Sequence, residues 1–283
     1  MSPTRDLSKR TTHRKARSGE DRRLARLLVQ LVDAGLAGGI FVVPMLMGGR
    51  QALGRLVLAA LAVVVALAWT IRQCLHAQGV WRRSPAEWVL LGGVVLLVVQ
   101  VVPLPAPILE HAAPHTSELL PLWNTDADAP AKLGLWSQIS LTPAATRAAL
   151  VVFLAYGLLF LVTVQRIQAL EDVERLLRWC ALSALMMAAF GLVQLIASNG
   201  KFFWFYEHLY VHTRDVAKGA FPNKNHFAHF LALGIGPLIW WMQDGLRRRR
   251  RAQTEKSSAW PARSEPFDLG VGFRMIALAI VLL

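Results

Sequence analysis

Long hydrophobic blocks alternate with short polar segments along the whole chain. A bilayer core about 30 Å thick is crossed by roughly 20 apolar residues in helical form. Every backbone N–H and C=O group inside a bilayer has to find its partner within its own segment, so blocks of this length are expected to be helices. Seven blocks qualify or nearly qualify: 27–47, 52–71, 87–105, 147–164, 176–197, 224–242 and 271–283.

The pattern predicts an all-α fold, a polytopic integral membrane helix bundle with about seven transmembrane helices. The block at 271–283 is shorter than the others because the sequence stops at Leu283, so we expect a truncated helix there. The predicted membrane domain spans 27–283 and follows a polar, Arg-rich tail at 1–26. Its two long loops are 106–146 and 198–223.

The composition agrees with a membrane protein. Hydrophobic residues make up 54% of the 283 positions, and the 20 glycines raise the apolar share further. Soluble chains reach only about 45–50% on a count that already includes glycine. Charged residues are 17% of the chain, against about 25% in soluble proteins. This balance excludes both a disordered tail and an ordinary soluble enzyme.

The excess positive charge, +13, is divided among separated clusters next to the hydrophobic blocks. A nucleic-acid-binding protein would gather its Lys and Arg residues into one patch or stripe, so we expect no nucleic-acid partner. Cytoplasmic loops of membrane proteins are rich in Lys and Arg, which predicts a cytoplasmic N-terminus. The cytoplasmic segments are then 1–26, 72–86, 165–175 and 243–270.

The loop at 198–223 contains a group of aromatic residues. Aromatic side chains of this kind form belts at the interface between membrane and water. Their flat faces also stack on the C–H faces of sugars, so a platform for sugar rings or for a lipid tail is a second interpretation. The composition leaves both interpretations open. The group consists of Phe202, Phe203, Trp204, Phe205, Tyr206 and Tyr210.

Basic and polar residues follow the aromatic group, directly before the sixth block. The first turn of a helix offers unpaired N–H groups and a partial positive charge, which suit a phosphate or pyrophosphate. Arg214 and Lys218 add full positive charges, and Gly219 permits a tight turn. The alternative is that Asn223 or Asn225 caps the helix while the lysines contact lipid headgroups.

The histidines of this region do not form a metal-binding pattern. His226 and His229 are three residues apart and share a helix face. A zinc peptidase requires the pattern HExxH, whereas Phe227 follows His226 here. We therefore expect no metal ion.

A second polar group precedes the fourth block. Ser140 or Thr142 fits a helix cap with Pro143 at the first helical position. Arg147 then lies at the start of an apolar helix, where an arginine is costly enough to indicate an anionic partner. Asp33 is an acidic residue inside the first predicted span, and the sequence assigns it no role.

Two segments resemble motifs of the O-antigen ligase and polymerase family of bacterial membrane proteins. RDVAKGAFPNKNHFAHFLALGIGPL at 214–238 is similar to a motif in which a basic residue and a glycine precede closely spaced asparagines and a helix of small residues. WSQISLTPAATRAAL at 136–150 is similar to a motif that precedes an earlier helix. Outside these segments the likeness is limited to hydropathy and helix order.

The resemblance implies an enzyme of the bacterial inner membrane that acts in lipopolysaccharide biosynthesis. It would transfer a glycan from an undecaprenyl-pyrophosphate carrier to a sugar hydroxyl of an acceptor glycan or lipid A core on the periplasmic face, without a cofactor. Carried onto this sequence, the pyrophosphate-binding residues are Arg147, Arg214 and Lys218, which would stabilise charge on the leaving group. The turn that presents them would be shaped by Gly219, Phe221, Asn223 and Asn225.

The family continues with further spans and a large periplasmic loop that carries a catalytic-type histidine. This sequence ends before such a loop, so we expect an incomplete fragment, and His226 is not the family histidine. Two other classes stay open. One is a multi-span transporter, which predicts paired charges and broken helices in the membrane; the other is a non-catalytic assembly subunit of polysaccharide export. The sequence does not separate ligase, polymerase and protein O-glycosyltransferase.

Overall fold

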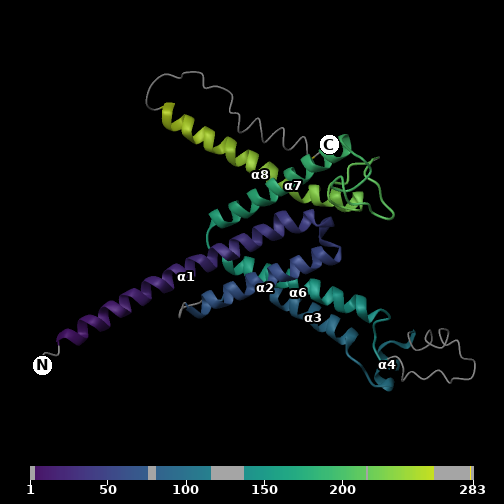
Figure 1. The fold of residues 1–283 in the computed structure, drawn as a ribbon, viewed down its shortest axis with the longest axis horizontal. Helices are drawn as coiled ribbons and strands as arrows, with labels where there is room; N and C mark the ends of the chain where they lie inside the picture. Colours follow the sequence, from purple (N-terminus) through teal and green to yellow (C-terminus); the bar gives the residue numbers. More distant parts are fainter. Residues whose placement is uncertain (1–3, 76–80, 116–136, 215, 258–280, 282–283) are drawn as a thin grey trace, which may run out of the picture. The chain divides into compact units, whose positions relative to one another are not determined.

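The computed structural model describes residues 4–75, 81–115, 137–214, 216–257 and 281 (Figure 1). Within these residues the regular secondary structure is helical, which confirms the all-α prediction. The chain divides into two compact units, one of residues 1–75 with 166–283 and one of residues 76–165.

The first helix pair of the larger unit is α1 (Thr4–Met45) and α2 (Ala52–Leu75), which lie side by side in Figure 1. Small residues let the two backbones approach, as is usual for membrane helices: the side chain of Val65 fills the space where Gly35 has none. The connecting turn contains the 3₁₀ helix η1 (Met47–Gly49), whose residues have φ angles of 53°, 68° and 72°.

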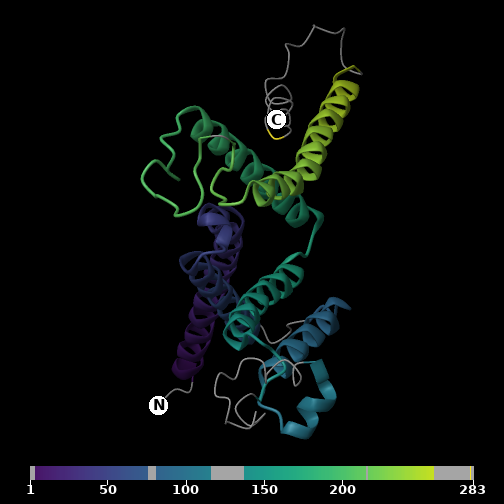
Figure 2. The same cartoon turned by 90° about the vertical axis from the view of Figure 1, so that its right-hand side faces the viewer.

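The second helix pair of this unit is α7 (Leu170–Ile196) and α8 (Lys224–Ser257), also side by side in Figures 1 and 2. Gly234 of α8 lies against Ala184 of α7, so small residues set the spacing here too. Helices α1 and α7 are in contact as well. The buried Ser183 hydroxyl of α7 donates a hydrogen bond to a backbone carbonyl of α1 at 2.7 Å.

The smaller unit contains α3 (Ala86–Val101), α4 (Ala106–Ala112) and α6 (Pro143–Arg166) up to its last residue. Helix α3 ends where it does because Val102 precedes a proline, which disfavours helical backbone, and Val102 is extended with φ −69° and ψ 133°. The buried Gln165 amide exchanges two hydrogen bonds, of 2.8 and 2.9 Å, with the backbone of Arg82.

Four helices of the described residues are long and apolar enough to cross a membrane: Glu20–Met45 of α1, α2, α6 and α7. Large hydrophobic side chains on them face outward, for example Leu56 at 66% exposure and Leu67 at 56%. Soluble monomers rarely expose so many large apolar side chains together. The chain is therefore a membrane protein with membrane-spanning helices.

The predicted count of seven spans is confirmed only in part. The blocks at 87–105 and 224–242 form helices, but α3 is apolar over only 16 residues, and α8 starts and ends with polar residues. The block at 271–283 lies outside the described residues except for residue 281, which is helical.

The helices extend beyond the predicted blocks. Helix α1 begins at Thr4 rather than at 27 and includes most of the basic tail, and α8 continues to Ser257 rather than 242. Hydropathy marks only the part of a helix that meets hydrocarbon, whereas backbone hydrogen bonding continues into polar sequence. The predicted 106–146 loop contains α4 and, from Pro143, the start of α6, and its residues 116–136 lie outside the described residues.

Candidate functional site

The loop at 198–223 folds back on itself between α7 and α8. Thr213, which is only 2% exposed, links the beginning and the end of this loop. Its hydroxyl lies 2.8 Å from the Ser198 hydroxyl and donates to the Lys201 carbonyl at 3.2 Å. Phe202, which belongs to this loop, is fully buried. The loop therefore has a small core of its own, which gives its surface side chains defined positions.

The aromatic group of this loop divides into buried and exposed members. Phe203 packs against Phe190 of α7, with the ring centroids 5.2 Å apart and the two rings tilted by 30°. The indole N–H of Trp204 donates to the Ala197 carbonyl at 2.8 Å. Phe205 and Tyr210 are 77% and 86% exposed. These two rings are available to a membrane interface or to a ligand, and both interpretations of the group stay predictions.

Gly219 forms the tight turn that the sequence predicts, with a φ of +52°. A Cβ atom here would lie 2.7 Å from the Phe227 ring and 3.1 Å from the Met187 sulfur, so only glycine fits. Gln194 of α7, 2% exposed, holds the turn. In the amide orientation that satisfies both groups, it donates to the Gly219 carbonyl at 2.6 Å and accepts from the Phe203 N–H at 3.0 Å.

The two basic residues of the motif are tied to different parts of the loop. The Arg214 guanidinium lies over Gly200 and donates to the Asn199 carbonyl at 3.3 Å. The Lys218 ammonium donates to the His212 carbonyl at 2.6 Å. Each carbonyl takes up only part of the donors on its cation, so Arg214, which is exposed, and Lys218 keep donors for an anion.

Asn223 caps α8, and Asn225 does not. The Asn223 side-chain oxygen accepts from the Asn225 N–H at 2.8 Å, and its carbonyl accepts from the Phe227 N–H at 3.2 Å. Of the two candidate caps, the structure therefore selects Asn223. The Asn225 side chain is exposed in the first turn of α8.

The structure adds Arg50, which sequence reasoning missed, and brings it to His226. The Arg50 guanidinium nitrogen Nη1, from the turn between α1 and α2, lies 3.4 Å from Nε2 of His226 in the first turn of α8. The neighbouring Gln51 amide lies 3.4 Å from the Tyr206 hydroxyl. The sequence signal for this contact was the pair Arg50 and Gln51, two polar residues between two hydrophobic blocks.

An apolar cavity of about 600 Å³ lies between α7 and α8. Its wall includes Leu192, Phe227 and Leu231, and its polar lining comes from Lys224 and Asn225 at the start of α8. The basic motif thus borders a space that suits hydrocarbon.

Arg147 belongs to the smaller unit. It is exposed in the first turns of α6, which begins at Pro143 as predicted. The Ser140 hydroxyl lies 2.7 Å from the Thr146 hydroxyl and accepts the Thr142 N–H at 3.2 Å, so it organises the turn before the helix. Trp136 of the same motif lies outside the described residues.

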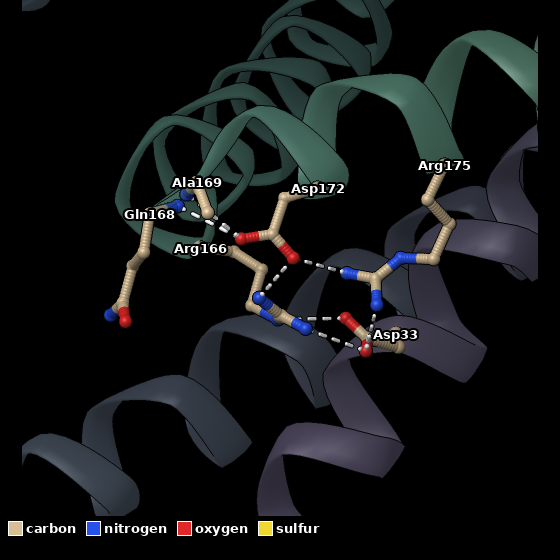
Figure 3. A network of polar contacts seen from close by, with 6 residues as sticks. All are labelled: Asp33, Arg166, Gln168, Ala169, Asp172 and Arg175. Atoms are coloured by element: carbon tan, nitrogen blue, oxygen red, sulfur yellow. Dashed lines mark hydrogen bonds and ion pairs between the residues drawn. The ribbon is translucent and has the colours of Figure 1, made fainter. Parts of the chain in front are cut away.

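A second polar cluster surrounds Asp33, to which the sequence assigned no role (Figure 3). Both Asp33 oxygens accept from the Arg166 guanidinium at 2.9 Å, and one lies 3.6 Å from Arg175. Asp172 accepts from Arg166 at 3.0 Å and from Arg175 at 2.9 Å. It also accepts the backbone N–H groups of Gln168 and Ala169 before α7. We call these four charged residues the Asp33 network.

Further along α7 and α8, a second ion-pair group is more exposed. Arg178 and Arg248 both contact Glu174, at 2.9 and 3.2 Å. Arg248 also pairs with Asp244 at 2.9 Å. The hydrogen bonds to Asp244 and the negative charges of Asp244 and Glu174 raise the pKa of Arg248 above its ordinary value.

Within the described residues, no group of three or more His, Cys, Asp and Glu side chains is arranged to hold a metal ion. Comparison with known proteins adds no assignment: no family model, no curated protein and no solved structure matches the chain. The function is therefore argued from the residues and their geometry.

Proposed function

We propose that the protein is a glycan transferase of the bacterial inner membrane. It takes a glycan from an undecaprenyl-pyrophosphate carrier and passes it to an acceptor sugar on the periplasmic face. In this proposal Arg214 and Lys218 bind the pyrophosphate and stabilise its charge as the leaving group departs.

The observation that carries the proposal is the construction of the motif around Gly219. Gln194, Phe227 and the Asn223 cap hold a glycine turn at the start of α8. Arg214 and Lys218 precede that turn in the same loop, and an apolar cavity of about 600 Å³ has Lys224 and Asn225 of the first turn of α8 in its lining. A lipid pyrophosphate has the same two parts, an anionic head and a hydrocarbon chain. Helix N-termini favour such anions.

The proposed topology has seven spans, which include α3, α8 and the block at 271–283 besides the four long apolar helices. The N-terminus is cytoplasmic, so the loops 106–146 and 198–223 face the periplasm. A reporter active only in the periplasm should be active when fused at Asp126 and silent when fused at Arg250. The reverse pattern would overturn the orientation.

The function is tested in a host strain that lacks the gene and carries the full-length protein on a plasmid. Arg214→Ala and Lys218→Ala should each abolish the polysaccharide ladder on a gel, because the pyrophosphate loses a charge-assisted contact. Lys201→Ala is the matched control: this lysine lies in the same loop but pairs with Glu207 at 3.2 Å. It should leave the ladder unchanged.

Membrane-fraction immunoblots separate lost function from lost insertion. All three variants should be present in the membrane at the level of the unsubstituted protein. Unchanged ladders in both Arg214→Ala and Lys218→Ala would remove the proposal, and so would an equal loss in Lys201→Ala.

A multi-span transporter is the second candidate, and one observation favours it. Asp33, inside a candidate span, is paired with Arg166 and Arg175, and paired charges of this kind occur in transport pathways. If transport is the function, Asp33→Asn should abolish polysaccharide export. Arg214→Ala should then leave export intact.

A further inference from the structure

The Asp33 network leaves one neighbouring arginine without an acidic partner. Arg72, in the last turn of α2, is close enough to Arg166 for the two positive charges to repel. Arg166 and Arg175 pair with the two carboxylates of Asp33 and Asp172, so Arg72 adds one positive charge in excess. Within the part of the chain that the structure describes, no carboxylate pairs with Arg72.

Neither carboxylate is free to serve Arg72. Both Asp33 oxygens are occupied by Arg166 at 2.9 Å. One Asp172 oxygen is shared by Arg166 and Arg175, and the other accepts two backbone N–H groups. A further bond to Arg72 would have to displace one of these contacts.

Two neighbouring buried N–H groups, one of Trp69 and one of Arg72, lack a hydrogen-bond acceptor among the described residues. The Arg72 guanidinium lies over the Trp69 ring, with its central carbon 4.8 Å from the ring centroid. Trp69 is only 4% exposed. Neither its indole N–H nor the Arg72 Nε–H has a hydrogen-bond partner among the described residues. Unpaired buried donors of this kind are uncommon and call for an acceptor.

The place of Arg72 in the sequence of α2 points to the acceptor. Arg72 is three residues from the end of a candidate span, and tryptophan and arginine at the ends of spans meet lipid headgroups. A guanidinium matches the oxygens of a phosphate in a two-pronged geometry. Basic sites of this kind between membrane helices bind anionic headgroups.

We propose that Arg72, beside Trp69 and the Asp33 network, binds the phosphate of an anionic phospholipid headgroup. The surplus positive charge selects a headgroup with net negative charge over a zwitterionic one. The site does not depend on the proposed glycan transfer, because it involves none of the residues of the 198–223 loop.

The test is native mass spectrometry of the full chain, purified in detergent and titrated with phosphatidylglycerol, phosphatidylcholine or inorganic phosphate. The unsubstituted protein should retain phosphatidylglycerol in preference to phosphatidylcholine. Arg72→Gln should weaken phosphatidylglycerol binding about tenfold, the worth of one charge-assisted hydrogen bond. Arg248→Gln is the control, since Arg248 is exposed and already paired with Asp244, and it should bind like the unsubstituted protein.

A thermal-unfolding series with the same lipids checks the folded state of each variant. Phosphatidylglycerol should raise the Tm of the unsubstituted protein and of Arg248→Gln, but not that of Arg72→Gln. Equal phosphatidylglycerol affinity in Arg72→Gln would overturn the proposal, as would an equal loss in Arg248→Gln. Competition by inorganic phosphate at the concentration of the lipid would overturn it in favour of a site for soluble anions.

Discussion

The guanidinium of Arg50 lies 3.4 Å from the His226 ring nitrogen Nε2, although the two residues are 176 positions apart in the sequence. The contact brings the turn between α1 and α2 to the first turn of α8. It adds a positive charge at the helix end where the motif asparagines lie. The candidate anion site thus draws on α1 and α2 as well as on the loop before α8.

We expect Arg50→Ala to lower glycan transfer about tenfold, because a charge-assisted contact near the helix N-terminus is lost. His226→Ala should lower it less, since the ring positions Arg50. The double variant should resemble Arg50→Ala alone, because the two side chains act as one unit. Transfer is measured from polysaccharide ladders at matched membrane levels. Full activity in Arg50→Ala would exclude this residue from the site.

Gly219→Ala is expected to destabilise the protein by about 1–3 kcal/mol, the usual cost of a strained backbone position. The added Cβ atom would meet the Phe227 ring at 2.7 Å. Gly236→Ala is a matched control, because a Cβ atom at Gly236 has no neighbour within 4 Å. It should be neutral or stabilise α8 by up to about 1 kcal/mol. Thermal unfolding in detergent compares the two, and equal Tm values would contradict the role of the turn.

Gln194→Leu should also destabilise the loop, by about 1–3 kcal/mol for each backbone group left without a partner. The groups concerned are the Gly219 carbonyl and the Phe203 N–H. Gln194→Glu keeps the shape of the side chain and can still accept from the Phe203 N–H. Its carboxylate has no donor for the Gly219 carbonyl, so that hydrogen bond is lost. Hydrogen exchange in residues 198–223 should rise in both variants. Unchanged exchange would show that the loop is held by other contacts.

Asp33→Asn removes the carboxylate that pairs with Arg166 and Arg175. The cost should be somewhat below the about 3–5 kcal/mol seen for fully buried pairs, because the Asp33 and Arg166 side chains are 22% and 15% exposed. Adding Arg166→Gln should recover part of the loss, since it removes the uncompensated charge. A double-mutant cycle on the free energy of unfolding measures the coupling. Strictly additive effects would mean that the pair contributes nothing.

Hydropathy predicted the helices because a membrane span depends on local composition alone. The same property hid the true ends of α1 and α8, where polar residues continue the helix. The division into two units was also not predictable, since it depends on which helices pack together.

The turn at Gly219 and the cap before α8 could be predicted because their geometry is set by neighbouring residues. Arg50–His226 and Asp33–Arg166 could not, because their members are 176 and 133 positions apart. Gln194 was equally hidden: a single polar residue in an apolar helix does not indicate which backbone groups it will meet. In each case the missing information was which distant segments of the chain come together in the folded protein.

The glycine contacts between α7 and α8 have a thermodynamic consequence. The Phe227 ring fits between Gly191 and Gly219, and the cavity of about 600 Å³ lies between the same two helices. A hydrocarbon chain that changed the spacing of α7 and α8 would therefore move the turn beside Lys218. Linkage then requires that an anion bound at the turn alter the affinity of the cavity for hydrocarbon by the same factor. The binding of the head and the binding of the tail of one lipid would then be coupled.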